Sequence, residues 1–214
     1  MMIEVKNLTL SAAGRILCSG VSFELGNGEK AVLTGASGCG KSSLLRAMVG
    51  LHGIDAGGIE IDGVELSAAT LGVIRQRIVF LAQEPVMGAE SVREALLLPF
   101  TFKLNARLSP GPEKISETLD RMELPETILD QPASRLSGGE KQRIAIARGL
   151  LMGRDIVFAD EITAALDGDS RDKVIGVLQR LPVTMLAVAH DPAFRNAFPV
   201  EYRMENLLLR KVRP

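Results

Sequence analysis

The fold is decided by the stretch Gly35-Ala36-Ser37-Gly38-Cys39-Gly40-Lys41-Ser42, which fits the phosphate-binding pattern G-x-x-x-x-G-K-[ST]. Its glycines allow the positive φ angles and the close backbone approach that wrapping a phosphate requires. A short apolar run at residues 31–34 precedes the loop and suits a buried strand. The loop opens a helix whose apolar face carries Leu44, Leu45 and Met48. The sequence therefore predicts a strand, a phosphate loop and a helix that together bind a nucleotide.

The residue types of this loop indicate how each part would contact ATP. Its backbone N–H groups would form an anion-binding nest, and the positive end of the following helix would face the phosphates. Lys41 would reach the β- and γ-phosphates, and the hydroxyl of Ser42 would coordinate Mg²⁺. We therefore expect ATP and Mg²⁺ as cofactors. The residues expected to bind the nucleotide are Gly35, Ala36, Ser37, Gly38, Cys39, Gly40, Lys41, Ser42 and Ser43.

Two further strand ends carry side chains suited to phosphoanhydride hydrolysis. The apolar run at residues 156–159 is typical of a buried parallel strand and delivers Asp160 and Glu161 at its carboxyl end, where ligands bind in open α/β sheets. Asp160 would hold Mg²⁺ through water, and Glu161 would act as the general base on the attacking water. His190 follows another apolar run, and we expect it to contact the γ-phosphate.

A second glycine turn, Ser137-Gly138-Gly139, opens a helix predicted over residues 140–151. This is again an anion-binding helix end, although one chain has no evident need of two such ends for one triphosphate. The simplest interpretation is that Ser137 and Gly139 bind the γ-phosphate of ATP held by a second copy of the chain.

Composition limits the class of protein. The chain has 214 residues, 46% of them hydrophobic, and a net charge of −1, which does not favour a nucleic-acid partner held by bulk charge. Its two cysteines fit a reducing cytosol. We find no secretory signal pattern and no apolar stretch long enough to cross a membrane. The basic residues near the end, Arg203, Arg210, Lys211 and Arg213, are expected on a solvated strand and tail.

We predict an α/β fold: a P-loop NTPase core with a mainly parallel sheet, an antiparallel β edge and a helical subdomain. The alternating runs at residues 3–10 and 16–25 would form the antiparallel edge. Prolines punctuate short helical segments between residues 85 and 136. We therefore expect one domain over 1–214, with the core at 1–84 and 137–214 and the helical subdomain at 85–136.

The chain resembles ATP-binding-cassette (ABC) ATPases over nearly its whole length. The matching elements, in order, are the phosphate loop, Gln83, Leu136-Ser137-Gly138-Gly139-Glu140, Asp160-Glu161, the segment Ala164-Ala165-Leu166-Asp167, and His190. More narrowly, the strings at 124–129, 136–144 and 160–163 look like those of ATP-binding subunits of iron exporters of the Fet type.

This resemblance implies a two-lobed subunit that dimerises head-to-tail around two ATP molecules. It implies that Gln83 links Mg²⁺ and the attacking water to the helical lobe, which contacts a membrane permease, and that Asp167 lies across the dimer interface. The expected location is cytoplasmic, on the inner face of the cell membrane. Two positions depart from the family pattern. Ala164 stands where Ser is usual, and Ala12-Ala13-Gly14 stands where an aromatic residue normally stacks on adenine. The first aromatic residue is Phe23, which is one candidate to stack on the base from a distant segment.

Three functions compete on this evidence. The first is an ATPase motor for a separate permease, with iron export as the narrower reading. The second is a soluble ABC ATPase that remodels an assembly such as an iron–sulfur scaffold. The third, a nucleic-acid clamp, is disfavoured because long coiled-coil insertions, zinc motifs and strong basic charge are absent from the sequence.

Overall fold

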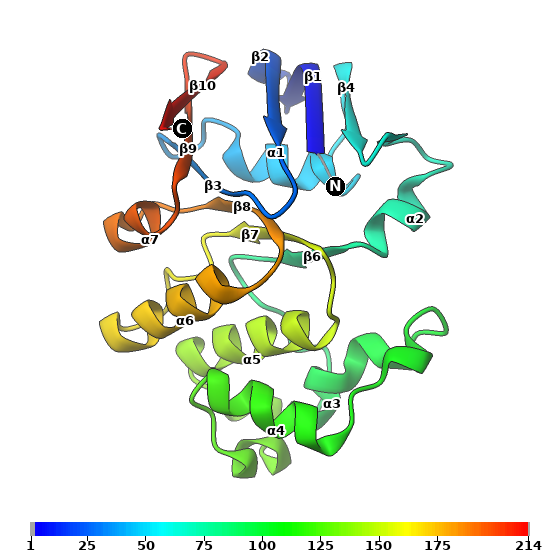
Figure 1. Ribbon diagram of the computed structural model, residues 1–214, viewed down its shortest axis with the longest axis vertical. Helices are drawn as coiled ribbons and strands as arrows, with labels where there is room; N and C mark the ends of the chain where they lie inside the picture. Colours follow the sequence, from blue (N-terminus) through cyan, green and yellow to red (C-terminus); the bar gives the residue numbers. More distant parts are fainter. Residues whose placement is uncertain (1–2, 214) are drawn as a thin grey trace. The chain divides into compact units, whose positions relative to one another are not determined.

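The computed structural model describes residues 3–213 as two sheets with helices (Figure 1). The strands are β1 Ile3–Ala12, β2 Arg15–Leu25, β3 Lys30–Gly35, β4 Ala56–Ile61, β5 Val64–Glu65, β6 Ile78–Leu81, β7 Ile156–Asp160, β8 Thr184–Val188, β9 Val200–Glu205 and β10 Leu208–Arg213. The α-helices are α1 Lys41–Met48, α2 Leu71–Arg75, α3 Val92–Leu97, α4 Pro112–Arg121, α5 Gly138–Leu151, α6 Gly168–Arg180 and α7 Pro192–Ala197. Short 3₁₀ helices are η1 Leu98–Thr101, η2 Ala106–Leu108, η3 Glu126–Asp130 and η4 Ala133–Arg135. Across residues 3–213, no helix has both the length and the apolar character that crossing a bilayer requires.

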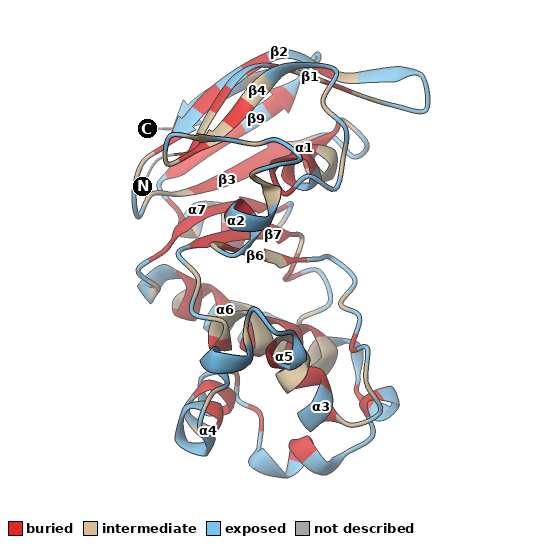
Figure 2. Ribbon diagram, turned by 90° about the vertical axis from the view of Figure 1, so that its right-hand side faces the viewer, coloured by how far each residue is buried: buried red, intermediate tan, exposed pale blue. Residues whose placement is uncertain are grey.

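The larger sheet has six strands in the order β10-β9-β3-β8-β7-β6. Strands β9, β3, β8 and β7 are parallel neighbours, and β10 pairs antiparallel with β9. The neighbouring strands β7 and β8 are buried along their whole length, which fits their mostly apolar sequences; Figure 2 shows this for β7. This arrangement brings the carboxyl ends of β3, β7 and β8 to one edge of the sheet.

The smaller sheet is antiparallel, with strand order β2-β1-β4-β5. Alternate residues of β1, including Ile3 and Val5, point into one apolar core with the buried face of α1 and with Leu33 of β3. Helix α1 therefore packs between the two sheets (Figure 1). The predicted α/β class, with a mainly parallel sheet, an antiparallel β edge and a helical part, is confirmed.

The chain divides into two compact units. The first comprises the chain up to Phe80, Asp155–Glu161 and the chain from Pro182 onward. The second comprises Leu81–Arg154 and Ile162–Leu181, so it includes α5 and α6 as well as the helices between residues 85 and 136. The bounds predicted from the sequence, with the core at 1–84 and 137–214 and the helical subdomain at 85–136, rest on motif positions. The two units rest on contacts between residues, so the predicted bounds remain a prediction.

The second unit is held together by packing and by a partly buried arginine. Arg148 of α5 donates hydrogen bonds to the carbonyl oxygens of Val86, Met87 and Ala95 at 3.0–3.3 Å. Burial lowers the pKa of Arg148. The contacts fasten α5 to the segment before α3 and to α3 itself.

Candidate functional site

The phosphate loop joins β3 to α1, and its backbone requires glycine at both ends. Gly35 has a φ of +146°, and a Cβ there would lie 2.4 Å from the carbonyl oxygen of Met204 in β9. Gly40 has a φ of +106°, and its Cβ would lie 2.9 Å from the Cβ of Leu17. A side chain at either position would clash or strain the loop, so the spacing of these two glycines sets the loop conformation.

Lys41 is the first residue of α1, and it is buried although charged. Its Nζ donates hydrogen bonds to the carbonyl oxygens of Gly35 and Ala36, at 3.0 and 2.7 Å. The ammonium group is therefore held inside the loop that presents N–H groups to an anion. A buried cation at a helix N-terminus is well placed for phosphate.

Ser42 and Asp160 meet at the edge of the sheet. The Ser42 hydroxyl donates a 2.7 Å hydrogen bond to Oδ1 of Asp160, which is 1% exposed at the end of β7. The other carboxylate oxygen, Oδ2, lies 3.9 Å from a guanidinium nitrogen of Arg46, and it has no hydrogen-bond partner within residues 3–213. Hydroxyl and carboxylate oxygens are the donors that Mg²⁺ prefers, so this pair fits the metal that accompanies ATP.

Glu161 and His190 lie together beside this pair. Oε1 of Glu161 is 3.2 Å from Nε2 of His190, and the Glu161 N–H donates to the carbonyl oxygen of Val188 at the end of β8. Glu161 has a φ of +49°, an unfavourable conformation for a residue with a Cβ. Such strain is concentrated at functional sites, where the surrounding structure holds it in place. The structure thus brings Ser42, Asp160, Glu161 and His190 together within the first unit.

The remaining predicted site residues belong to the second unit. Ser137 caps α5 in a reciprocal capping box with Glu140, whose pKa is lowered by the Ser137 hydroxyl. A Cβ on Gly139 would lie 3.6 Å from the carbonyl oxygen of Ala165, so the Ser137–Gly139 turn and the segment 164–167 are neighbours. Gly138 is the first residue of α5. These contacts describe local structure, and the assignment of Ser137, Gly138 and Gly139 to ATP stays a prediction.

Asp167 and Gln83 also lie in the second unit, Asp167 directly before α6 and Gln83 shortly after β6. Asp167 caps α6 by accepting a hydrogen bond from the N–H of Ser170 at 2.9 Å, and this bond lowers the pKa of Asp167. Gln83 follows β6. Their roles at the dimer interface and at Mg²⁺ stay predictions.

One expectation from the sequence needs correction. Phe23, a candidate to stack on the base from a distant segment, is 6% exposed and packs against Tyr202 with ring centroids 5.2 Å apart, so its ring belongs to the core. The basic end is largely exposed, as expected, but Arg203 and Arg213 also contact the carboxylate of Glu201, which is 4% exposed.

Sequence reasoning missed the buried carboxylate of Glu201. No local signal marked it, because Glu201 alternates with the apolar Val200, Tyr202 and Met204 along β9, a pattern that predicts a solvated glutamate on the opposite face. Such a residue is buried only when cations accompany it.

Comparison with known proteins places this geometry in a family. The family model described as ABC transporter matches residues 18–164. The chain is 31% identical over 194 residues to the "Probable iron export ATP-binding protein FetA" of Escherichia coli (strain K12), covering 89% of this chain and 85% of that protein. It is 35% identical to the putrescine transport ATP-binding protein PotG of the same organism, covering 89% of this chain and 51% of PotG.

Comparison with a solved structure also finds the fold of an ATP-binding cassette. The chain superposes with a TM-score of 0.85 and 27% identity on the dimeric post-hydrolysis state of the ATP-binding cassette MJ0796 bound to ADP and Pi, covering 99% of both chains. The resemblance predicted from the motifs is confirmed by both kinds of comparison. With the phosphate loop, the strand-end carboxylates and the glycine turn in this order, the chain belongs to the ABC transporter family as one of its ATP-binding motor domains.

Proposed function

We propose that this chain is a Mg²⁺-dependent ATPase that drives transport through a separate membrane permease. The observation that carries the proposal is the convergence of Ser42, Asp160, Glu161 and His190 at the strand edge beside the phosphate loop. Family membership supports ATP binding and hydrolysis, and the oxygen donors of Ser42 and Asp160 support magnesium as the metal. When bound, the metal would neutralise phosphate charge and orient the triphosphate.

The residues of this chain would divide the work as follows. The loop N–H groups and Lys41 hold the phosphates. Glu161 accepts a proton from the attacking water, and its strained backbone fixes the carboxylate at the end of β7. His190, in contact with Glu161, stays within reach of the γ-phosphate. Gln83 would join the metal and water to the second unit.

A second copy of the chain would complete the site. Ser137, Gly138 and Gly139 of one copy would bind the γ-phosphate held by the other, and Asp167 would lie across that interface. The dimeric state of the MJ0796 cassette supports this assembly, as does the helix end that Ser137 opens. The two copies would then enclose two ATP molecules head-to-tail and separate after hydrolysis.

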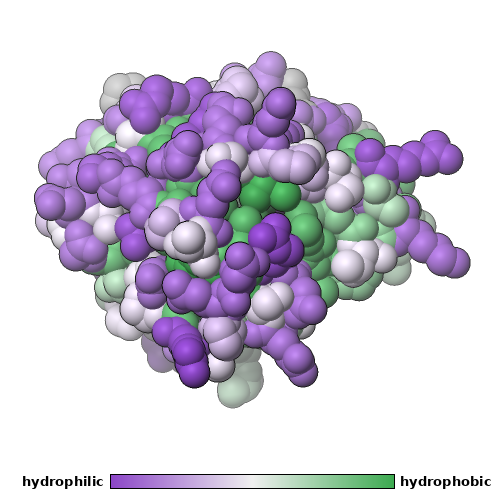
Figure 3. Space-filling view, turned by 90° about the horizontal axis from the view of Figure 1, so that it is seen from below, coloured by the Kyte–Doolittle hydropathy of each residue, from purple (hydrophilic) through white to green (hydrophobic). Residues whose placement is uncertain are grey.

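The permease would dock on the second unit. Large apolar side chains are exposed there, among them Phe102 at 60% and Leu104 at 72%. Figure 3 shows apolar atoms reaching the surface between polar ones on the face seen from below. Such exposed apolar groups suit a protein partner, and we infer a peripheral position on the inner face of the cell membrane. The name of the FetA relative supports iron export as the transport reaction, whereas PotG is named for putrescine.

Phosphate release by the purified chain tests the ATPase, and reconstitution tests the transporter role. We expect Mg²⁺-dependent phosphate release that Lys41→Ala abolishes. Co-expression with a candidate permease should place the chain in the membrane fraction, and Phe102→Ser with Leu104→Ser should return it to the supernatant. Leu208→Ser, at an exposed apolar position of the first unit, is the matched control. Hydrolysis without any membrane association would instead favour an ATPase that remodels a soluble assembly.

A further inference from the structure

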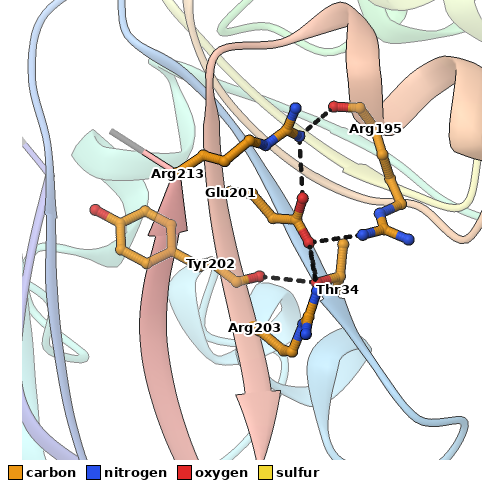
Figure 4. Close-up of polar contacts among 6 residues, drawn as sticks. All are labelled: Thr34, Arg195, Glu201, Tyr202, Arg203 and Arg213. Atoms are coloured by element: carbon orange, nitrogen blue, oxygen red, sulfur yellow. Dashed lines mark hydrogen bonds and ion pairs between the residues drawn. The ribbon is translucent and has the colours of Figure 1, made fainter.

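A single buried carboxylate gathers three arginines on one face of β9 and β10 (Figure 4). Oε1 of Glu201 accepts from the Thr34 hydroxyl at 2.9 Å and from Arg195 at 2.9 Å, and it lies 3.5 Å from Arg203. Oε2 lies 3.0 Å from a guanidinium nitrogen of Arg213. Thr34 comes from β3 directly before the phosphate loop, and Arg195 comes from α7, which begins two residues after His190.

The charges in this cluster do not balance. Burial acts to raise the pKa of Glu201, but hydrogen bonds from Thr34 and Arg195 and the arginine charges outweigh it, so the pKa lies below the ordinary value. Glu201 is therefore ionised at neutral pH and supplies one negative charge against three guanidinium groups. Arg210 lies directly opposite Arg203 across the β9–β10 ladder and adds a further cation on the same face. The cluster keeps a surplus of positive charge.

Besides the surplus charge, the arginines of this cluster keep guanidinium N–H donors that can bind a ligand. A guanidinium has five N–H donors, and among residues 3–213 Arg203 makes one hydrogen bond, to Glu201. The Nε of Arg195 is buried and, within the described part of the chain, has no hydrogen-bond partner. Planar forks with free N–H groups are the usual partners of phosphate and related oxyanions.

These donors open onto a pocket. The pocket has a volume of about 210 Å³, several times the roughly 30 Å³ that one water occupies. It is lined by Thr34, Gly35, Ala189, His190, Arg195 and Arg203. Gly35 begins the phosphate loop and His190 is the predicted γ-phosphate contact, whereas Arg195 and Arg203 are not part of the loop. The pocket therefore adjoins the place where phosphate would be produced.

We propose that this pocket is a second oxyanion site beside the phosphate loop that takes inorganic phosphate with Arg195 and Arg203 as its ligands and Glu201 as the group that positions them. Phosphate leaving the γ-position would pass to this site without any covalent step. The choice of phosphate as the ligand rests on the proposed ATPase function, and the existence of a basic oxyanion site does not.

Equilibrium dialysis with radiolabelled inorganic phosphate tests the site directly. A saturating non-hydrolysable Mg-ATP analogue would occupy the phosphate loop together with the γ-phosphate position, so that the remaining phosphate binding reports the pocket. We expect Arg203→Gln and Arg195→Gln each to weaken phosphate binding by about tenfold, the usual effect of removing a charge-assisted hydrogen bond. Lys211→Gln is the matched control, because Lys211 is the neighbour on β10 that contacts Glu29 and Tyr202 on the other face. Excess sulfate should displace the bound phosphate, and chloride at equal ionic strength should not.

Several results would overturn the proposal. Phosphate binding that survives in both arginine variants, or that Lys211→Gln weakens equally, would exclude a specific site. Equal displacement by chloride would reduce it to charge screening. Arg203 is half-exposed, so Arg203→Gln should fold, and an unchanged ADP affinity would verify this. A chain that binds phosphate but hydrolyses no ATP would refute the proposed ATPase and leave the pocket standing. A chain that hydrolyses ATP but binds no phosphate while the ATP analogue fills the loop would refute the pocket and leave the ATPase standing.

Discussion

The hydroxyl of Ser42, in the first turn of α1, donates a 2.7 Å hydrogen bond to Oδ1 of Asp160, which lies 118 positions later at the end of β7. The bond joins the phosphate loop to the strand that carries the acidic pair. It also leaves the second oxygen of Asp160 buried without a hydrogen-bond partner among residues 3–213. A buried carboxylate in this condition is a strong candidate for a metal contact.

Asp160→Asn should weaken Mg²⁺-dependent ATP hydrolysis while it keeps the hydrogen bond from Ser42. The amide preserves the shape of the side chain but removes the negative charge that favours the cation. We expect a loss of at least about tenfold in turnover at saturating ATP, corresponding to about 1.4 kcal/mol. The dependence of turnover on Mg²⁺ concentration should move to higher concentration. A variant with unchanged turnover and unchanged Mg²⁺ dependence would remove Asp160 from the metal site.

Glu161→Gln should keep ATP and Mg²⁺ binding but abolish most hydrolysis. The substitution retains size and the positive-φ backbone while it removes the base. If hydrolysis opens the dimer, size-exclusion chromatography with ATP should show a stable dimer of the variant, and the wild-type chain should show it only transiently. Ser137→Ala is the matched control in the same background, since it should weaken the ATP-bound dimer. Undiminished turnover in Glu161→Gln would exclude this residue as the base.

Local pattern was sufficient for much of the fold. Strand β7 ends at Asp160, as the apolar run at 156–159 predicted, and α5 runs from Gly138 to Leu151 where a helix over 140–151 was predicted. The phosphate loop also predicted β3 and α1 correctly, because its glycines permit the positive φ angles that other residues rarely adopt and that the turn between this strand and helix requires. The sequence could therefore predict which side chains lie together at the carboxyl ends of the strands.

Contacts that depend on strand order were not predictable. Thr34 and Arg203 are register partners because β9 lies beside β3 in the sheet, and no local pattern encodes that neighbour. The same is true of Phe23, whose burial depends on Tyr202 from a strand far along the chain. The basic residues between 203 and 213 were evident from the sequence, but the buried carboxylate of Glu201 that organises the arginines was not.

Cys39 should react with a maleimide more slowly when Mg-ATP is bound. It lies in the phosphate loop and is partly exposed, with its sulfur 3.9 Å from Nζ of Lys41. Cys18 provides an internal control, because it is fully buried and burial raises its pKa. Peptide mapping should find label on Cys39 alone, with protection by nucleotide. Equal labelling of Cys39 with and without saturating Mg-ATP would argue against phosphate binding by the loop.

Glu201→Gln should destabilise the first unit by about 2 kcal/mol, because it removes the charge that satisfies the arginines around it. The sign of the pH dependence follows from the lowered pKa of Glu201. Its stabilising contribution is fully present above the unfolded value, near 4.5, and is lost as the pH falls through the lower folded value. Chemical denaturation at pH 7 and at pH 4 and below should therefore show a smaller difference between variant and wild type at the acidic end. A difference that is constant over this range would mean that Glu201 is not ionised in the fold.

ATP and GTP should bind the isolated chain with similar affinity. Phosphate contacts do not distinguish the base, and residues 12–14 form an exposed turn without an aromatic ring. Phe23 cannot supply one, since its ring is packed in the core. Stacking contributes roughly 1–3 kcal/mol per base in nucleic-acid sites, so a new ring should tighten ATP binding by about tenfold. Ala12 is the better position for it, because Ala13 has a φ of +49° that a bulky residue tolerates poorly.

Competition between ATP and GTP for the wild-type chain and for Ala12→Tyr measures this effect. The variant should bind both purine nucleotides more tightly, because stacking tolerates either ring. Ala13→Gly is the matched control, since it relieves the positive φ in the same turn without adding a ring. A strong preference for ATP in the wild-type chain, unchanged by Ala12→Tyr, would show that a hydrogen-bonding group elsewhere reads the adenine edge.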